Sequence, residues 1–348
     1  MCKLVSPILL AISLLMSGVV AAAPTGTVFT ANERAASISQ VRLDDGSTAT
    51  FSLDIAPHNV QVSPDGKRLL AVGVSAHASH HPNSGGGGQL LVFALPSDGK
   101  PAFALPLDGH PAHVITDLSG TRAFVSDSDN NAIAVFDLEQ RSRIGTIKTG
   151  KYPHGLRLSP DGKEIYVANV KDDSVSVIDV ASLQETARIA VGRAPVQVGF
   201  APDGKHSYVS LSAENKVGII DTVQRKLSGK IAVGNTPIQL FATPDGKQMY
   251  VANQGSSKRP DNRVSVIAPA NQTVITTIQT GAGAHGVAIS GDGNYAFVSN
   301  IEDGTFSVID TAANKVIATH KVGAGPNGIS YAADATTDKR AGTVAPSN

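Results

Sequence analysis

The chain has 348 residues, and its 29 Lys and Arg residues balance its 29 Asp and Glu residues, so the formal net charge is zero. This length suits one large β domain or two smaller ones, and the balanced charge argues against a nucleic-acid binder, which normally carries a basic excess. The sole cysteine is Cys2. The chain after it therefore has no disulfide, thiolate metal site or thiol nucleophile.

The first 22 residues are predicted to be a secretory signal peptide. Lys3 precedes the apolar run "PILLAISLLMSGVV" (7–20), and three alanines follow it. This order of positive charge, apolar segment and small residues is typical of such peptides, with cleavage expected after Ala21 or Ala22. The run is short for a membrane span, and no later segment approaches one. We therefore expect a periplasmic or secreted protein without a membrane span, most simply a monomer.

A repeat fills the rest of the sequence. Its marker is Pro-Asp-Gly, with degenerate copies at two places, and the marker glycines are Gly66, Gly120, Gly162, Gly204, Gly246 and Gly293. Three successive steps, from Gly120 to Gly246, are 42 residues each. Internal repetition at this period is typical of propellers and other repeat architectures.

Each repeat predicts four short strands. In the copy at 150–192 they are His154–Ser159, Glu164–Asn169, Ser174–Asp179 and Glu185–Gly192, with the Pro-Asp-Gly turn between the first two. Apolar and polar residues alternate in the later strands, and Val, Ile and Tyr dominate them. A repeated four-stranded unit of this length indicates a β-propeller blade.

The two ends of the chain each carry part of a blade. Seven first strands can be counted, and the seventh, Asn327–Ala332, has no further strands after it. Near the N-terminus, "TVFTANE", "SISQVRL" and "TATFSLDI" match strands two to four of a blade that lacks its first strand. We therefore expect an all-β, seven-bladed propeller over 27–333. Pairing of the C-terminal inner strand with the three N-terminal strands should close it, leaving 334–348 as a flexible tail.

The second strands carry a specific resemblance. "YVAN" stands at 166–169 and at 250–253, and "FVSN" stands at 297–300, each followed by a strand of the "SVSVID" type. The chain thus resembles the YVTN family of β-propeller repeats over nearly its whole length after the signal peptide. This resemblance implies the propeller fold. It leaves function open, since related propellers include secreted binding proteins, lactonase-like enzymes and the haem-d1 domain of nitrite reductases.

Four histidines are predicted at one end of the central channel, here called the top. His58, His154 and His285 each stand eight residues before a marker glycine, and His113 is one residue out of this register. Two insertions, Val74–Gln89 and Gln254–Arg263, fall between strands two and three and so share the top face. Deviations gathered on one face suggest that this face binds something. The alternative is structural, because such histidines can cap backbone groups, and their spacing around the ring does not require them to meet on one metal ion.

Further candidates extend this site. Arg157 and the amides Gln61, Gln197 and Gln239 lie in the inner strands, where they could bind a polar ligand or merely satisfy backbone groups. His77, His80 and His81 lie in the first insertion. They could bind Zn²⁺ or Cu²⁺, or belong to a solvated loop.

Three functions follow, in order of preference. The first is an exported binding or scaffold protein whose top face and channel mouth hold a small molecule or an extracytoplasmic protein. The second is a lactonase-like enzyme, or one that depends on haem or a metal. The third is a zinc or copper carrier that uses the histidine-rich loop. Enzymatic activity is not favoured, because the predicted inner strands hold one acid, Asp117, and the sequence has no G-x-S-x-G or C-x-x-C-H motif.

Overall fold

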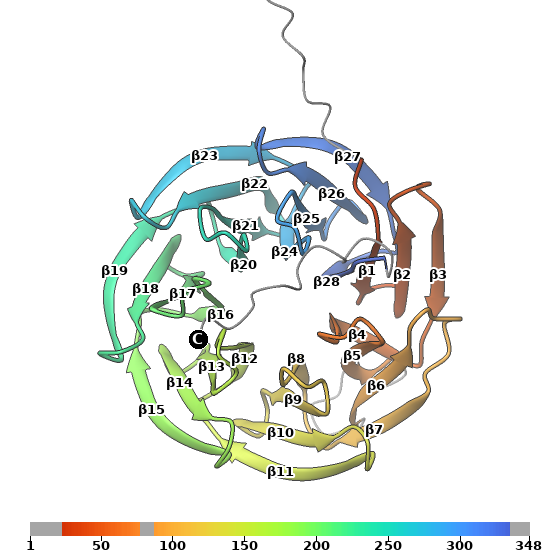
Figure 1. Ribbon diagram of the computed structural model, residues 1–348, viewed down its shortest axis with the longest axis horizontal. Helices are drawn as coiled ribbons and strands as arrows, with labels where there is room; N and C mark the ends of the chain where they lie inside the picture. The colour runs from red at the N-terminus through yellow and green to blue at the C-terminus, as the bar shows by residue number, and fades with distance from the viewer. Residues whose placement is uncertain (1–22, 77–86, 335–348) are drawn as a thin grey trace, which may run out of the picture.

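In the computed structural model, which describes residues 23–76 and 87–334, the chain forms seven four-stranded antiparallel sheets. Figure 1 shows the sheets arranged as blades around a central axis, with the first strand of each blade innermost. The predicted all-β, seven-bladed propeller is therefore confirmed. Within the two described ranges, no helix has the length and apolar character needed to cross a membrane.

Each blade has an inner, a second, a third and an outer strand, and the blades are numbered by their inner strands, from blade one at β4 to blade seven at β28. The innermost strands are β4 (Ile55–Val62), β8 (Pro111–Thr116), β12 (Pro153–Leu158), β16 (Pro195–Phe200), β20 (Pro237–Ala242), β24 (Ala284–Ile289) and β28 (Pro326–Ala332). The second strands are β5 (Arg68–Ser75), β9 (Arg122–Asp127), β13 (Glu164–Asn169), β17 (His206–Leu211), β21 (Met249–Ser256), β25 (Tyr295–Asn300) and β1 (Thr27–Asn32). The third strands are β6 (Gly88–Ala94), β10 (Ala132–Asp137), β14 (Ser174–Asp179), β18 (Lys216–Asp221), β22 (Arg259–Ala268), β26 (Thr305–Asp310) and β2 (Ser37–Arg42). The outer strands are β7 (Phe103–Leu107), β11 (Ser142–Lys148), β15 (Gln184–Ala190), β19 (Lys226–Ala232), β23 (Thr273–Gln279), β27 (Lys315–Lys321) and β3 (Thr48–Ser52).

Blade seven closes the ring as predicted. β28 pairs antiparallel with β1, from Thr27 opposite Ala332 to Asn32 opposite Pro326. The side chain of Ser330 on β28 also accepts a hydrogen bond from the backbone N–H of Val62, at 3.0 Å, and so ties this blade to blade one. Closure leaves no open sheet edge between the first and last strands of the ring.

The hydrophobic core lies between neighbouring blades. Because side chains alternate between the two faces of a strand, each blade packs one face on the preceding blade and the other on the next. Tyr166 of the "YVAN" motif is fully buried, and its ring contacts Phe200 of the next blade edge-on at a centroid distance of 4.9 Å. The same cluster includes Val177 and Val209 from the two blades.

The asparagine of the motif has a structural role that is visible only in the fold. Asn169 ends β13, and its Nδ2 donates hydrogen bonds to Ser174 Oγ at 3.0 Å and Ser176 Oγ at 2.8 Å on β14. Ser176 Oγ in turn accepts the backbone N–H of Gly150, at 3.3 Å. The buried amide therefore joins strands two and three to the loop that enters the blade. Asn32, Asn253 and Asn300 occupy the same place and make similar bonds.

The strand predicted at His154–Ser159 begins one residue earlier, at Pro153, so His154 is the second residue of β12. One detail differs from the sequence predictions. The insertion 254–263 was expected as a loop; instead it lengthens β21 and β22 into a longer hairpin. Gly255, with φ +69°, lies at the bulge where the register of these two strands shifts. The first insertion lies largely at 77–86, outside the described residues.

The closing strand predicts a large effect of truncation. A chain ending at Gly325 should lose the inner strand of blade seven and expose the edge of β1. Its free energy of unfolding should fall by more than about 2–5 kcal/mol, the usual cost of losing one buried Ile side chain such as Ile329. Denaturant unfolding checks this, with a chain ending at Asp334, which keeps β28, as the control. Equal stability of the two truncated chains would show that closure by β28 is not required.

Candidate metal and ligand site at the channel mouth

Irregular pairing at the start of the inner strands directs the channel-mouth side chains. In blade one the register shifts between Pro57 and Asn59, which leaves His58 as an extra residue. In blades two and three the shift spans 111–114 and 153–156, which includes His113 and His154. Such bulges free side chains from the regular alternation of a strand and turn them in new directions.

These bulges bring three histidines together, which the sequence analysis did not predict. His58, His113 and His154 come from three consecutive blades, and one ring nitrogen of each lies within 4.8 Å of those of the other two. The Nε2 atoms of His58 and His154 are 3.2 Å apart. The register of the sequence had grouped His58 and His154 with His285 and set His113 aside. Blades two and three each leave two residues unpaired at this bulge. His113 is the second of them in blade two and His154 is the first in blade three, and the two imidazoles lie together at the channel mouth. His58, His113 and His154 are called the three-histidine cluster below.

Burial keeps two members of the cluster uncharged. Desolvation lowers the pKa of His154 to about 3. The neighbouring imidazole of His58 also lowers this pKa, and its effect is larger than that of the hydrogen bond from the His154 ring to Val196 O, which raises the pKa. Desolvation, with the charges of His154 and His58, also holds the pKa of His113 well below its usual value. A neutral imidazole has one nitrogen with a free lone pair, which is the form that binds metal ions.

Hydrogen bonds from the rest of the fold orient the cluster. His154 Nδ1 lies 3.3 Å from Val196 O, so this nitrogen carries the proton and Nε2 carries the lone pair. Gly155 permits this close approach, because a Cβ at that position would collide with Gln197 Oε1 and Val196 O. This explains why glycine follows the histidine in the "PHG" sequence.

The closing blade supplies two groups that sequence reasoning missed as partners of His58. Its Nδ1 lies 3.3 Å from Glu33 Oε1 and 3.1 Å from Asn327 Nδ2. Burial alone would raise the pKa of Glu33, but the hydrogen bond and charge of His58, helped by the Asn327 amide, lower it to about 2. Glu33 follows β1, between strands two and three of blade seven. It therefore lies outside the predicted inner strands, where Asp117 is the one acid.

The Nδ1 contacts of His58 allow either neutral tautomer. With the proton on Nδ1, His58 donates to Glu33 and turns a free Nε2 lone pair toward His154. With the proton on Nε2, His58 accepts from Asn327 and donates to His154. In the first form both Nε2 lone pairs face each other at 3.2 Å, an arrangement that a cation between them would stabilise.

His285 does not join the cluster. It lies in blade six, and its Nδ1 donates to the backbone carbonyl of Asn327 at 2.9 Å. His154 makes the same kind of bond to the next inner strand, so this bond is the structural role shared by the two "HG" histidines. Desolvation, with the neighbouring His58, lowers the pKa of His285 to about 4.

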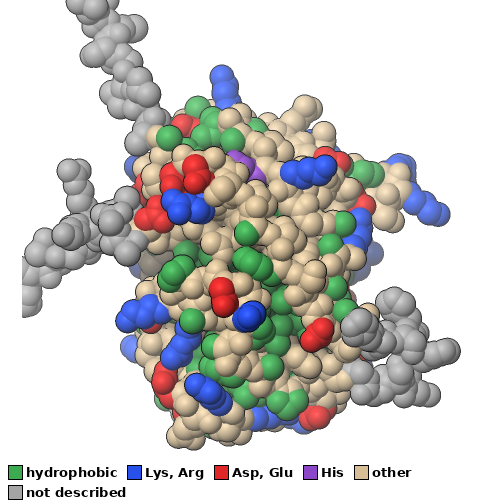
Figure 2. All heavy atoms as spheres, turned by 90° about the vertical axis from the view of Figure 1, so that its right-hand side faces the viewer, with side chains coloured by type: hydrophobic (Ala, Val, Ile, Leu, Met, Phe, Trp, Pro, Cys, Tyr) green, Lys and Arg blue, Asp and Glu red, His purple; other side chains and the backbone are tan. Residues whose placement is uncertain are grey.

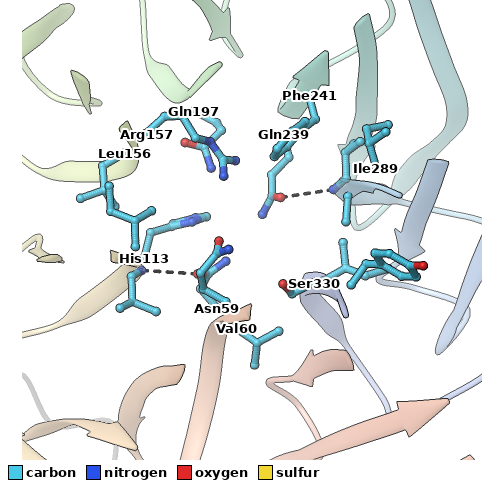
Figure 3. Close-up of a pocket in the computed structure, with 17 residues that line it drawn as sticks. Asn59, Val60, His113, Leu156, Arg157, Gln197, Gln239, Phe241, Ile289 and Ser330 are labelled. Carbon is cyan, nitrogen blue, oxygen red and sulfur yellow. Dashed lines mark hydrogen bonds between the residues drawn. The ribbon is translucent and has the colours of Figure 1, made fainter. Parts of the chain in front are cut away.

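A cavity of about 100 Å³ continues the site down the channel. The predicted candidates Arg157, Gln61, Gln197 and Gln239 all line it, and so does His113, which connects it to the cluster. Figure 3 shows the side chains of His113, Arg157 and Gln239 turned toward the same central space. The remaining metal candidates, His77, His80 and His81, lie outside the described residues.

Comparisons with known proteins agree with this fold. A family model described as a YNCE-like beta-propeller matches residues 111–225 and 208–341, which together span more than half of the chain. The chain belongs to the YNCE-like β-propeller family. This membership agrees with the YVTN-type resemblance of the repeats and says nothing of a ligand. No curated protein matches the sequence.

Two solved structures resemble this YNCE-like propeller. Hydrazine synthase of Kuenenia stuttgartiensis superposes with a TM-score of 0.71 at 20% identity, covering 81% of this chain and 91% of that one. A functionally unknown protein from Desulfotomaculum acetoxidans gives a TM-score of 0.74 at 16% identity, covering 89% of this chain and 99% of that one. At these identities the likeness shows the fold alone.

The pKa of His285 predicts acid sensitivity. The unfolded chain takes up a proton here as pH falls through about 6.5, whereas the folded chain does so only near 4, so folded stability is lost in between. From pH 7.5 to 5.0 this one group should cost about 2 kcal/mol. His285→Asn, the residue that blade seven carries at the matching position, should reduce the loss by that amount. Urea unfolding at both pH values, with a chelator present, measures it. The same loss in wild type and variant would contradict this account.

Proposed function

We propose that this propeller is a binding protein whose channel mouth takes up a divalent transition-metal ion on His58, His113 and His154. The observation that carries the proposal is the convergence of three imidazoles, with ring nitrogens within 4.8 Å of one another. Imidazole suits Zn²⁺, Cu²⁺ and Ni²⁺, whereas Ca²⁺ and Mg²⁺ prefer oxygen ligands. The site is therefore selective for transition metals by the chemistry of its donors.

The surroundings of the cluster favour metal binding over a purely structural role. Burial keeps His113 and His154 neutral, so they need not lose a proton before they bind a cation. Glu33 beside His58 is a carboxylate behind a ligand imidazole, an arrangement that fixes the ring and raises its basicity. A histidine that only caps the backbone, as His285 does, needs no such partner.

Binding is favoured over catalysis. Hydrolytic metal sites commonly pair the open coordination position with a free carboxylate or another base. Glu33 is engaged with His58 and Asn327. No carboxylate is among the described residues that line the cavity beneath the cluster.

Calorimetry on the metal-free protein tests this proposal. The background variant has His77, His80 and His81 changed to Ala, so that the loop cannot contribute. We expect this protein to bind one Zn²⁺ or Cu²⁺, with no comparable binding of Mg²⁺. His113→Ala should weaken the affinity by more than about 100-fold, since losing even an outer partner of a metal ligand typically costs 10–100-fold.

The control is His320→Ala, which removes a histidine that stacks on Phe306 at the outer strand β27, and it should bind as the background protein does. Equal affinity in His113→Ala and the background would refute the site. So would affinity no tighter than about 1 mM, which corresponds to only about 4 kcal/mol of binding free energy. Zinc binding that disappears with the loop histidines alone would favour a loop chelate instead.

We also propose that the protein works outside the cytoplasm, on the evidence of residues 1–22. N-terminal sequencing of the protein from its natural source should find Ala22 or Ala23 as the first residue. Recovery of the intact chain from the cytoplasm would contradict this.

A further inference from the structure

Arg157 is a cation in the wall of the central channel. In the described ranges it makes no ion pair with a carboxylate, and its buried Nε has no hydrogen-bond partner. Its guanidinium carbon lies 4.6 Å from the centre of the Phe241 ring, which supports the group in a stacked position. By contrast, Arg122 and Arg225 bind Asp117 and Glu164.

The charge of Arg157 persists in the folded protein. Desolvation lowers the pKa of Arg157 to about 10, which is still well above neutral pH. A partly buried charge without a carboxylate partner is costly, and the cost is relieved when an ion of opposite sign enters. The planar fork of a guanidinium suits an oxyanion, because two N–H groups can donate to two oxygens at once.

Gln239 adds a second unsatisfied donor to the same cavity. Its side chain is 4% exposed, and its Oε1 accepts the backbone N–H of Val287 at 3.2 Å. This bond fixes the orientation of the amide, and its buried Nε2 has no hydrogen-bond partner among the residues that the structure describes. Gln239 stands two residues before Phe241 on β20 and therefore shares its face. Figure 3 shows its amide nitrogen turned toward the space beside Arg157.

The other amides of the cavity complete the pattern. Gln197 Oε1 accepts the backbone N–H of Val198 at 2.9 Å, so its remaining capacity is its amide nitrogen. Gln61 is turned the other way, because its Nε2 donates to Val62 O at 2.9 Å and its oxygen is left as an acceptor. The wall thus presents one cation and two amide donors on one side and one acceptor on another.

We infer that this cavity binds a small oxyanion, either a short carboxylate or an inorganic oxyanion. Arg157 would supply the bidentate contact, and the amide nitrogens of Gln239 and Gln197 would supply further donors. A cavity of about 100 Å³ has room for a ligand of about the size of acetate or phosphate. This site stands on Arg157 and Gln239 and does not require a metal at the three-histidine cluster.

The test uses the full chain in the metal-free form, so its outcome is independent of the metal proposal. Thermal unfolding is followed while acetate, phosphate or sulfate replaces chloride at constant ionic strength. We expect at least one of these anions to raise the melting temperature, with saturation in the millimolar range, because a ligand of the folded state stabilises it. A response to acetate alone would identify a carboxylate site, and one to phosphate or sulfate would identify an inorganic oxyanion site.

Two variants locate the response, and a third controls for it. Arg157→Met should weaken the anion response by about 10-fold or more. Gln239→Glu places a carboxylate beside Arg157 and should abolish the anion response while the protein stays folded. This variant keeps the proposal testable if Arg157→Met fails to fold. The control is Arg188→Met, which removes an arginine paired with Glu185 on the outer strand β15 and should respond as wild type does. An unchanged response in Gln239→Glu, or no response of the wild type to any of the three anions, would overturn the inference and leave the cavity as a water-filled part of the channel.

Discussion

The pairing of β28 with β1 is the constraint on which the rest of this structure depends. It joins residues about 300 positions apart in the chain and fixes the seven sheets as a closed ring. It also brings Asn327, at the start of β28, and Glu33, after β1, against His58 of blade one. The pairing that closes the ring therefore also positions the side chains of the channel mouth. A propeller that opened between β28 and β1 would lose the groups that orient His58.

Within the closed ring, small irregularities decide what each blade presents to the channel. All seven inner strands begin at the same end, yet blades one, two and three direct imidazoles to a common point, whereas blade six uses its histidine to cap a neighbouring strand. Blades four and five carry Val196 and Ile238 in that register, and they contribute amides further down the channel. The candidate site thus occupies one arc of a repetitive fold, and the four-stranded pattern of the blades is kept. On the side of the molecule visible in Figure 2, acidic and basic side chains are interspersed. That mixture agrees with the balanced composition.

The fold could be predicted from the sequence because the period of a repeat can be read directly from the spacing of its marker residues. The turn glycines, the alternating strands and the incomplete blades at the two ends were enough to predict seven blades and their closure. The candidate site could be predicted only in part. Its histidines, arginine and amides could be placed on the inner strands, but register alone separated His113 from His58 and His154. A bulge shifts a side chain by one residue without leaving a mark in the sequence. Glu33 was not predicted because its role depends on a contact between the two ends of the chain. The role of Asn169 was not predicted because only the folded sheet brings its two serine partners near.

The most direct measurement is a crystal structure of the protein grown with Zn²⁺, with anomalous diffraction data collected on both sides of the zinc absorption edge. The account predicts one strong anomalous peak at the channel mouth, about 2.0–2.1 Å from a ring nitrogen of each of His58, His113 and His154. It also predicts that Glu33 accepts a hydrogen bond from His58 Nδ1 in that structure. Imidazoles that point away from one another, or zinc found only elsewhere on the protein, would contradict the claim that three blades of this propeller build one metal site.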